Sequence, residues 1–218
     1  MPSIVTNTLM ALNTSSSLGM FARDTGGCLL SRLSLSRSKD ESREISIAEI
    51  SESAVFYFSA PALARLSADR FSKAYKTDVN APFSNVYALS KNAKLAKLGR
   101  IGAVFGTILP AVFLIAPIRN YVTQAKTGKD KFTQVVELEK TQNEKNENPK
   151  EKSLNLIKKL TAISMGSLAA LFAFLKACNS EKIYKMAEPF IDKAVKHLDF
   201  TKTGDLELMH YAALIYPV

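Results

Sequence analysis

The stretch that decides the fold is IGAVFGTILPAVFLIAPI, residues 101–118, which holds no charged residue in 18 positions and has an arginine at either side. A transmembrane helix needs about 20 apolar residues to cross about 30 Å of hydrocarbon. Pro110 and Pro117 are tolerated in a spanning helix when neighbouring groups satisfy the freed carbonyls. We therefore predict a first transmembrane helix over residues 99–122, with a kink near Pro110.

A second apolar stretch, LTAISMGSLAALFAFL, covers residues 160–175 and lies between Lys159 and Lys176. Its 16 uncharged residues reach only about 24 Å as a helix. The stretch can cross a bilayer if the flanking lysines extend their charged ends to the interface. We predict a second transmembrane helix over residues 154–178, which would form a hairpin with the first.

Small residues recur in both apolar stretches and predict where the two helices pack. Gly102 and Gly106 form a GxxxG motif, and Ala162, Gly166 and Ala170 repeat small side chains at the same interval of four. Small residues let two helix backbones approach closely in lipid. The alternative is a pair of core helices in a soluble bundle, which the mean hydropathy of +0.01 favours.

A basic run comes immediately before the first apolar stretch and consists of Lys91, Lys94, Lys97 and Arg100. A cation close to an anionic membrane surface contributes about 1 kcal/mol of binding free energy. We therefore predict that these four residues contact lipid headgroups. The alternative is an ordinary solvated helix face.

The rest of the chain divides by composition. Residues 1–44, rich in Ser, predict a flexible or irregular leader. We predict amphipathic helices over residues 45–98. The first starts at a capping box of Ser46 with Glu49 and breaks or kinks at Pro61. A later helix starts near Ser84. Residues 123–153 predict a polar, partly disordered linker. Residues 179–218 predict a helical C-terminal region. This region ends within an apolar run, which hints at a longer natural protein.

Few residues could carry chemistry. Cys28 and Cys178 are 150 positions apart and belong to no ligand pair, and His197 and His210 lie outside any motif that would set them against a nucleophile. The chain has no Walker loop, HExxH or GxSxG pattern. We therefore expect no enzyme activity, no cofactor and no metal site.

The net charge of +9 is typical of proteins that bind nucleic acid, but the 29 Lys and Arg residues are scattered and no nucleic-acid-binding signature is present. We therefore do not expect a nucleic-acid partner.

We predict an all-α fold: a helical membrane protein with a two-helix transmembrane hairpin and amphipathic helical flanks. The expected function is a small, non-enzymatic integral membrane protein that anchors or organises partners at a surface with anionic headgroups. Without the basic and apolar segments of a secretory signal in the first 20 residues, we expect both flanks on the cytoplasmic side. The alternative is a soluble helical-bundle interaction module whose basic faces bind an acidic partner.

Overall fold

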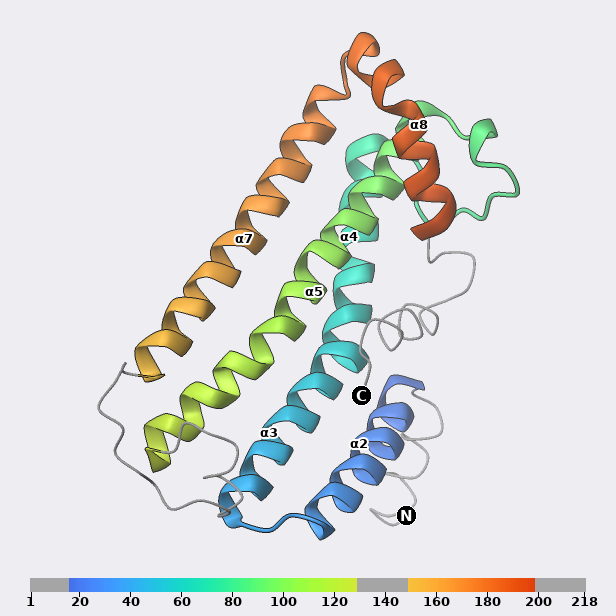
Figure 1. Cartoon of the computed structure of the whole chain (residues 1–218). Helices are drawn as coiled ribbons and strands as arrows, with labels where there is room; N and C mark the ends of the chain where they lie inside the picture. Colours follow the sequence, from blue (N-terminus) through green and yellow to red (C-terminus); the bar gives the residue numbers. More distant parts are fainter. Residues whose placement is uncertain (1–15, 129–148, 199–218) are drawn as a thin grey trace, which may run out of the picture. The chain divides into compact units, whose positions relative to one another are not determined.

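The structure is a computed structural model that describes residues 16–128 and 149–198, and every regular element in these ranges is a helix (Figure 1). This confirms the all-α class. In chain order the elements are α2 (Ser16–Ser34), α3 (Lys39–Ala54), the π-helical turn η1 (Val55–Ser59), α4 (Ala60–Tyr75), the 3-10 turn η2 (Val86–Ala88), α5 (Lys91–Thr127), α7 (Pro149–Ala177) and α8 (Glu181–Leu198).

The chain forms two compact units, and three helical segments pass from one unit to the other. Unit 1 comprises Met1–Ser59 and Pro110–Ala162, and unit 2 comprises Ala60–Leu109 and Ile163–Val218. Both α5 and α7 therefore contribute one part to each unit. Each unit is described by itself below.

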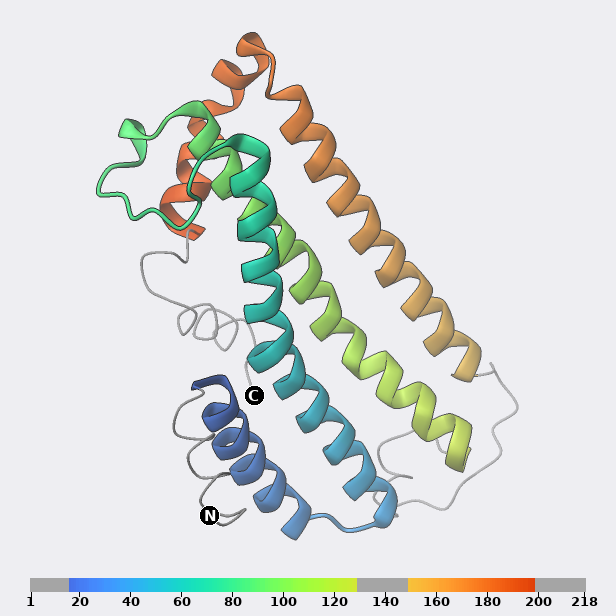
Figure 2. The same ribbon diagram turned by 180° about the vertical axis from the view of Figure 1, so that it is seen from behind.

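In unit 1, α2 and α3 form a helical pair joined by a short turn (Figure 2). Helix α2 lies within the stretch that the sequence suggested would be irregular. Its two adjacent glycines each weaken a helix by about 1 kcal/mol, but contacts to later residues hold it. The contacts are a hydrogen bond from Tyr57 to Asp24, a ring contact of Phe21 with Phe58 at 5.1 Å between centroids, and an ion pair of Arg32 with Glu49 at 2.5 Å.

Helix α3 starts earlier than the capping pattern at Ser46 suggested. Its N-cap is Ser38, whose hydroxyl accepts a hydrogen bond of 3.0 Å from the Glu41 amide. The Glu41 carboxylate in turn accepts from the Arg37 amide at 2.6 Å. The chain thus has two Ser-x-x-Glu patterns, and the earlier one caps the helix, while the Ser46 hydroxyl donates within the helix to the Ser42 carbonyl.

Pro61 does not break the chain into two separate helices. The π turn η1 comes just before it, and α4 continues from Ala60. A proline ring clashes with the carbonyl four residues earlier, and a π turn changes the local hydrogen-bond spacing at such a point. The helical path therefore runs from Lys39 to Tyr75 with one irregular turn.

In unit 2, α4 ends at Tyr75, and Lys76 takes a positive φ of 51° as the chain leaves the helix. The next helix of more than one turn starts at Lys91 rather than near Ser84, and the Ser90 hydroxyl accepts from the Ala93 amide at 3.3 Å. Helix α5 is continuous through both of its prolines. It has a buried stripe at spacings of three and four residues, consisting of Ile101, Val104, Ile108, Val112 and Ile115.

The ends of the predicted linker are helical, because α5 extends to Thr127 and α7 starts at Pro149. Three parts of the predicted regions lie outside the described residues: residues 1–15 of the leader predicted over 1–44, residues 129–148 of the linker, and residues 199–218 of the C-terminal region, with His210.

Candidate functional site

Two of the described helices, α5 and α7, are long and apolar enough to cross a membrane by length and composition. They differ in burial. In the most apolar 18-residue window of α5, 33% of the residues are buried, whereas only 6% are buried in the corresponding window of α7. Helix α7 therefore presents most of its apolar surface outward.

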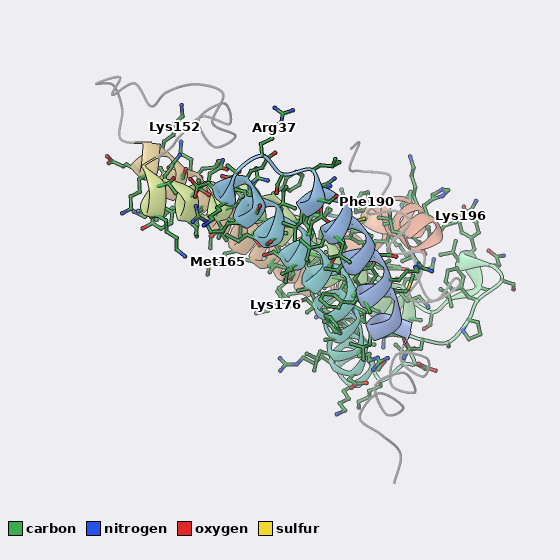
Figure 3. All side chains as sticks on the ribbon, turned by 90° about the horizontal axis from the view of Figure 1, so that it is seen from below. Arg37, Lys152, Met165, Lys176, Phe190 and Lys196 are labelled. Carbon is green, nitrogen blue, oxygen red and sulfur yellow. The ribbon has the colours of Figure 1, made fainter. Side chains whose placement is uncertain are left out.

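The outward surface of α7 carries large side chains. Met165, which Figure 3 labels, is 68% exposed. Ile163 and Phe172 are also more than half exposed. No acidic or basic residue occurs between Lys159 and Lys176. The exposed surface of α7 is therefore mostly apolar and carries no charge from residue 160 to residue 175.

Gly102 and Gly106 of α5 do face α7. A Cβ atom built on Gly102 would lie 2.5 Å from Cδ2 of Leu171, and one on Gly106 would lie 3.0 Å from Cδ2 of Leu168. The Ser164 hydroxyl donates to the Gly106 carbonyl at 3.2 Å. The two glycines thus make room for leucine side chains of α7.

The small residues predicted on α7 lie elsewhere. Ala162, Gly166 and Ala170 are exposed, and a Cβ on Gly166 would meet no atom within 4 Å. Helix α7 is turned so that leucines, and not small residues, meet the glycines of α5. The spacing of four, three and four residues through Ser164, Leu168, Leu171 and Leu175 was the available sequence signal for this face.

The predicted headgroup cations are placed against protein rather than at an open surface. Lys94 is only 3% exposed, and its ammonium nitrogen lies 2.9 Å from Oε1 of Glu188 and 2.8 Å from Oδ1 of Asp192 on α8. Lys91 lies nearby, 3.0 Å from Oε2 of Glu181. Two lysines of α5 therefore hold the three acidic residues of α8.

The other two cations hold the loop between α4 and α5. Lys97 is 1% exposed and donates to the carbonyls of Val79 at 2.8 Å and Ala81 at 3.1 Å. Arg100 is also buried and donates to Oδ1 of Asn80 at 3.0 Å. A buried ammonium must find acceptors, and these loop carbonyls supply them.

The pKa values follow these contacts. Burial by itself lowers the pKa of Lys94, but the donation of its ammonium to the carboxylates of Asp192 and Glu188 outweighs burial, so the pKa is raised above 10.5. The hydrogen bond from Lys94 lowers the pKa of the Glu188 carboxyl below its usual 4.5. Lys94 and Glu188 are therefore both charged across the neutral pH range.

Sequence analysis missed this cluster because its partners are about 90 positions apart in the chain. The only signal was that the acidic residues of α8 lie at positions 181, 188 and 192, at intervals of seven and four, on one side of a helix. That pattern alone does not identify which cations they meet.

A cavity of about 370 Å³ lies in unit 2 beside α4. Its lining is mostly apolar, and Arg70 is the one charged residue in it. Its lining includes Leu63, Leu66, Phe71 and Phe172.

Both cysteines are free thiols. Cys28 is exposed and lies in unit 1, and Cys178 is buried in unit 2. Among residues 16–128 and 149–198 no three His, Cys, Asp or Glu side chains gather as metal ligands would. No protein family, curated protein or solved structure matches this chain.

Proposed function

We propose that the chain is a non-enzymatic integral membrane protein whose helices α5 and α7 cross a lipid bilayer as a hairpin. The observation that carries this proposal is the exposure of α7, of whose most apolar window only 6% is buried. Soluble proteins rarely leave contiguous apolar patches larger than a few hundred Å² in contact with water. Lipid tails would cover this face without any further protein.

The dimensions of the helices support the same proposal. Helix α5 has 37 residues and α7 has 29, and each exceeds the roughly 20 residues that a span requires. The uncharged part of α7 is short, but Lys158, Lys159 and Lys176 at its two ends are exposed. Their long side chains can carry the charge to the interface while their stems stay in the apolar layer.

In this arrangement the residues before α5 and after α7 lie on the same side of the membrane, which we propose to be the cytoplasmic side. We propose that these helical flanks anchor or organise partner proteins at the membrane surface. The charged groups gathered at Lys94 hold α8 on α5, and we propose no catalytic role for them.

A soluble helical-bundle interaction module is the second candidate, and the partial burial of α5 favours it. Its inward stripe from Ile101 to Ile115 is buried. In unit 2, α4 also has a buried face that includes Ala64, Ala68 and Phe71. Such packing is what a soluble core requires.

Membrane fractionation of the full chain separates the two candidates. An integral protein stays in the pellet through high salt and alkaline carbonate and leaves it only with detergent. Release by salt or carbonate, or recovery as a soluble monodisperse species, would refute the hairpin.

A matched pair of variants sharpens the test. Met165→Lys with Ala169→Lys places two charges on the exposed face of α7, where a soluble protein tolerates them within about 0.5 kcal/mol each. In a bilayer each lysine near the centre of a span costs about 3 kcal/mol of insertion free energy. We expect this variant to lose carbonate resistance, whereas Leu156→Lys, which is exposed and lies before the uncharged stretch of residues 160–175, keeps it.

A further inference from the structure

Helix α8 has two different faces in unit 2. Its inward face includes the buried residues Tyr184, Ile191, Asp192 and Val195. The acidic residues of α8 lie on the side that meets α5, where all three pair with Lys91 or Lys94, although only Asp192 among them is buried. The opposite side of the helix therefore carries no acidic residue.

The outward face carries a row of large apolar side chains. Ile183, Met186 and Phe190 follow one another at spacings of three and four residues, so they share one side of the helix. Met186 is 78% exposed and Phe190 is 65% exposed (Figure 3). Such a row on a short surface helix is costly in water unless another phase covers it.

A row of lysines runs beside the apolar row. Lys182 and Lys185 each come one residue before an apolar side chain of the row, and Lys193 and Lys196 repeat the same two helical positions 11 residues later. One residue is a rotation of about 100°, so the two rows are neighbours on the helix surface. All four lysines are exposed (Figure 3 labels Lys196).

The apolar row is continuous with the apolar surface of α7. The ring of Phe190 meets that of Phe174 on α7 edge to face, with centroids 6.5 Å apart and planes at 88°. Helix α8 follows directly after the last turn of α7, with only Cys178–Ser180 between them. The surface proposed to meet lipid on α7 thus extends onto α8 without a polar gap at this contact.

Helix α8 also crosses the beginning of α5 rather than running alongside it (Figure 1). The acidic residues on α8 span 11 positions, or about 16 Å, whereas the two lysines that hold them span three positions of α5, or about 4.5 Å. A helix that crosses a spanning helix is inclined toward the membrane plane. Its outward face can therefore meet a flat surface along its length.

We propose that the outward face of α8 binds the anionic phospholipid surface of the bilayer, with its lysines at the headgroups and Ile183, Met186 and Phe190 at the acyl boundary. Helices with lysines on one face and apolar side chains beside them lie at such interfaces. The inference rests on the proposed membrane function. It assigns the headgroup contact to the lysines of α8, because the four cations of α5 bind groups of the protein instead.

The test uses the full chain reconstituted into vesicles, with an environment-sensitive fluorophore on α8. Cys28→Ser and Cys178→Ala remove the native thiols, and Met186→Cys supplies the attachment point. We expect a blue shift of the emission in vesicles of phosphatidylcholine with phosphatidylserine relative to phosphatidylcholine alone. The shift should decrease at about 1 M salt, where the Debye length falls to about 3 Å.

Two charge variants with the same change in net charge distinguish the site from a general effect of basicity. Replacing Lys182, Lys185, Lys193 and Lys196 with Gln should abolish the lipid-dependent shift, because each lysine near an anionic surface contributes about fivefold to binding. Replacing the exposed residues Arg37, Lys39, Lys150 and Lys152 with Gln should preserve it. Circular dichroism of both variants checks that the helices remain.

Each contrary outcome has a defined meaning. If the chain resists carbonate but the emission is the same in both vesicles, or the shift survives in the α8 variant, the inference about α8 is overturned and the membrane function stands. If carbonate removes the chain from the vesicles, the proposed function itself has failed. If an acidic polymer such as a DNA duplex produces the shift without lipid, the outward face is a site for a soluble polyanion and the lipid proposal is wrong.

Discussion

The ammonium of Lys94 lies 2.8 Å from the carboxylate of Asp192, although 98 positions separate the two residues in the chain. Both side chains are buried, with 3% and 8% of their surfaces exposed. Glu188 completes the contact at 2.9 Å. This cluster attaches α8 to the first turns of α5 and determines which face of α8 remains outward.

Removing the cation of this cluster should destabilise the protein. Lys94→Met leaves Asp192 buried without its counter-ion, which costs about 3 kcal/mol in comparable buried pairs. Chemical denaturation followed by circular dichroism would measure the loss. The double variant Lys94→Met with Asp192→Leu should recover most of it, because the one carboxylate left without its counter-ion, Glu188, is 39% exposed to solvent.

Lys91→Met is the matched control for that experiment. Its partner Glu181 is 65% exposed, so the pair is screened by solvent and contributes less than about 1 kcal/mol. An equal loss for Lys91→Met and Lys94→Met would mean that burial of the ion pair is not what stabilises the contact.

The attachment of α8 should be sensitive to acid and not to mild alkali. The pKa of Glu188 is lowered in the folded protein, so its contribution is present above the ordinary value of 4.5 and is lost as the pH falls through the lowered pKa. The pKa of Lys94 is raised, so its contribution is complete below 10.5 and is lost only as the pH rises above that value. Thermal midpoints measured from pH 3 to pH 10 should therefore fall only at the acidic end.

Glu188→Gln tests the assignment of that acid transition. This variant should have a lower midpoint at pH 7 than the natural chain and a smaller further decrease between pH 5 and pH 3. An unchanged acid transition would assign it to other carboxylates.

The glycines of α5 and α7 should respond in opposite directions to alanine. In Gly102→Ala the new Cβ lies 2.5 Å from Leu171, so the leucine must move, and crowding of this kind costs about 1–3 kcal/mol. In Gly166→Ala the new Cβ meets nothing within 4 Å, so the higher helix propensity of alanine should stabilise α7 by up to about 1 kcal/mol. Unfolding of both variants in the same detergent provides the comparison. Loss of stability in both would show that Gly166 is in a packed contact.

Lys97 should be required for the loop between α4 and α5. Lys97→Met removes the donor to the carbonyls of Val79 and Ala81, and a buried acceptor left without a partner costs about 1–3 kcal/mol. Hydrogen exchange of the amides from residue 77 to residue 90 should accelerate in this variant. Lys73→Met, at an exposed position of α4, should leave that exchange unchanged.

Local patterns in the sequence were enough to predict the helical class and the two apolar helices, because helical periodicity and charge-free length are properties of neighbouring residues. The GxxxG spacing also indicated Gly102 and Gly106 as positions that another helix can approach closely. Local patterns failed at the ends of elements. Residues 16–34 form a helix despite Gly26 and Gly27 because contacts with residues 49–58 hold them, and no local pattern contains that information.

Only the tertiary structure decided which cations meet protein and which face outward. The sequence by itself determined that a basic run precedes the first apolar stretch and that a helical region follows the second. The pairing of Lys91 and Lys94 with the acidic residues of α8 joins groups about 90 positions apart, and it gives the cations of α5 internal partners while the lysines of α8 face outward. The physical reason is that a buried charge must find its counter-charge, and the folding of the chain determines where that counter-charge lies.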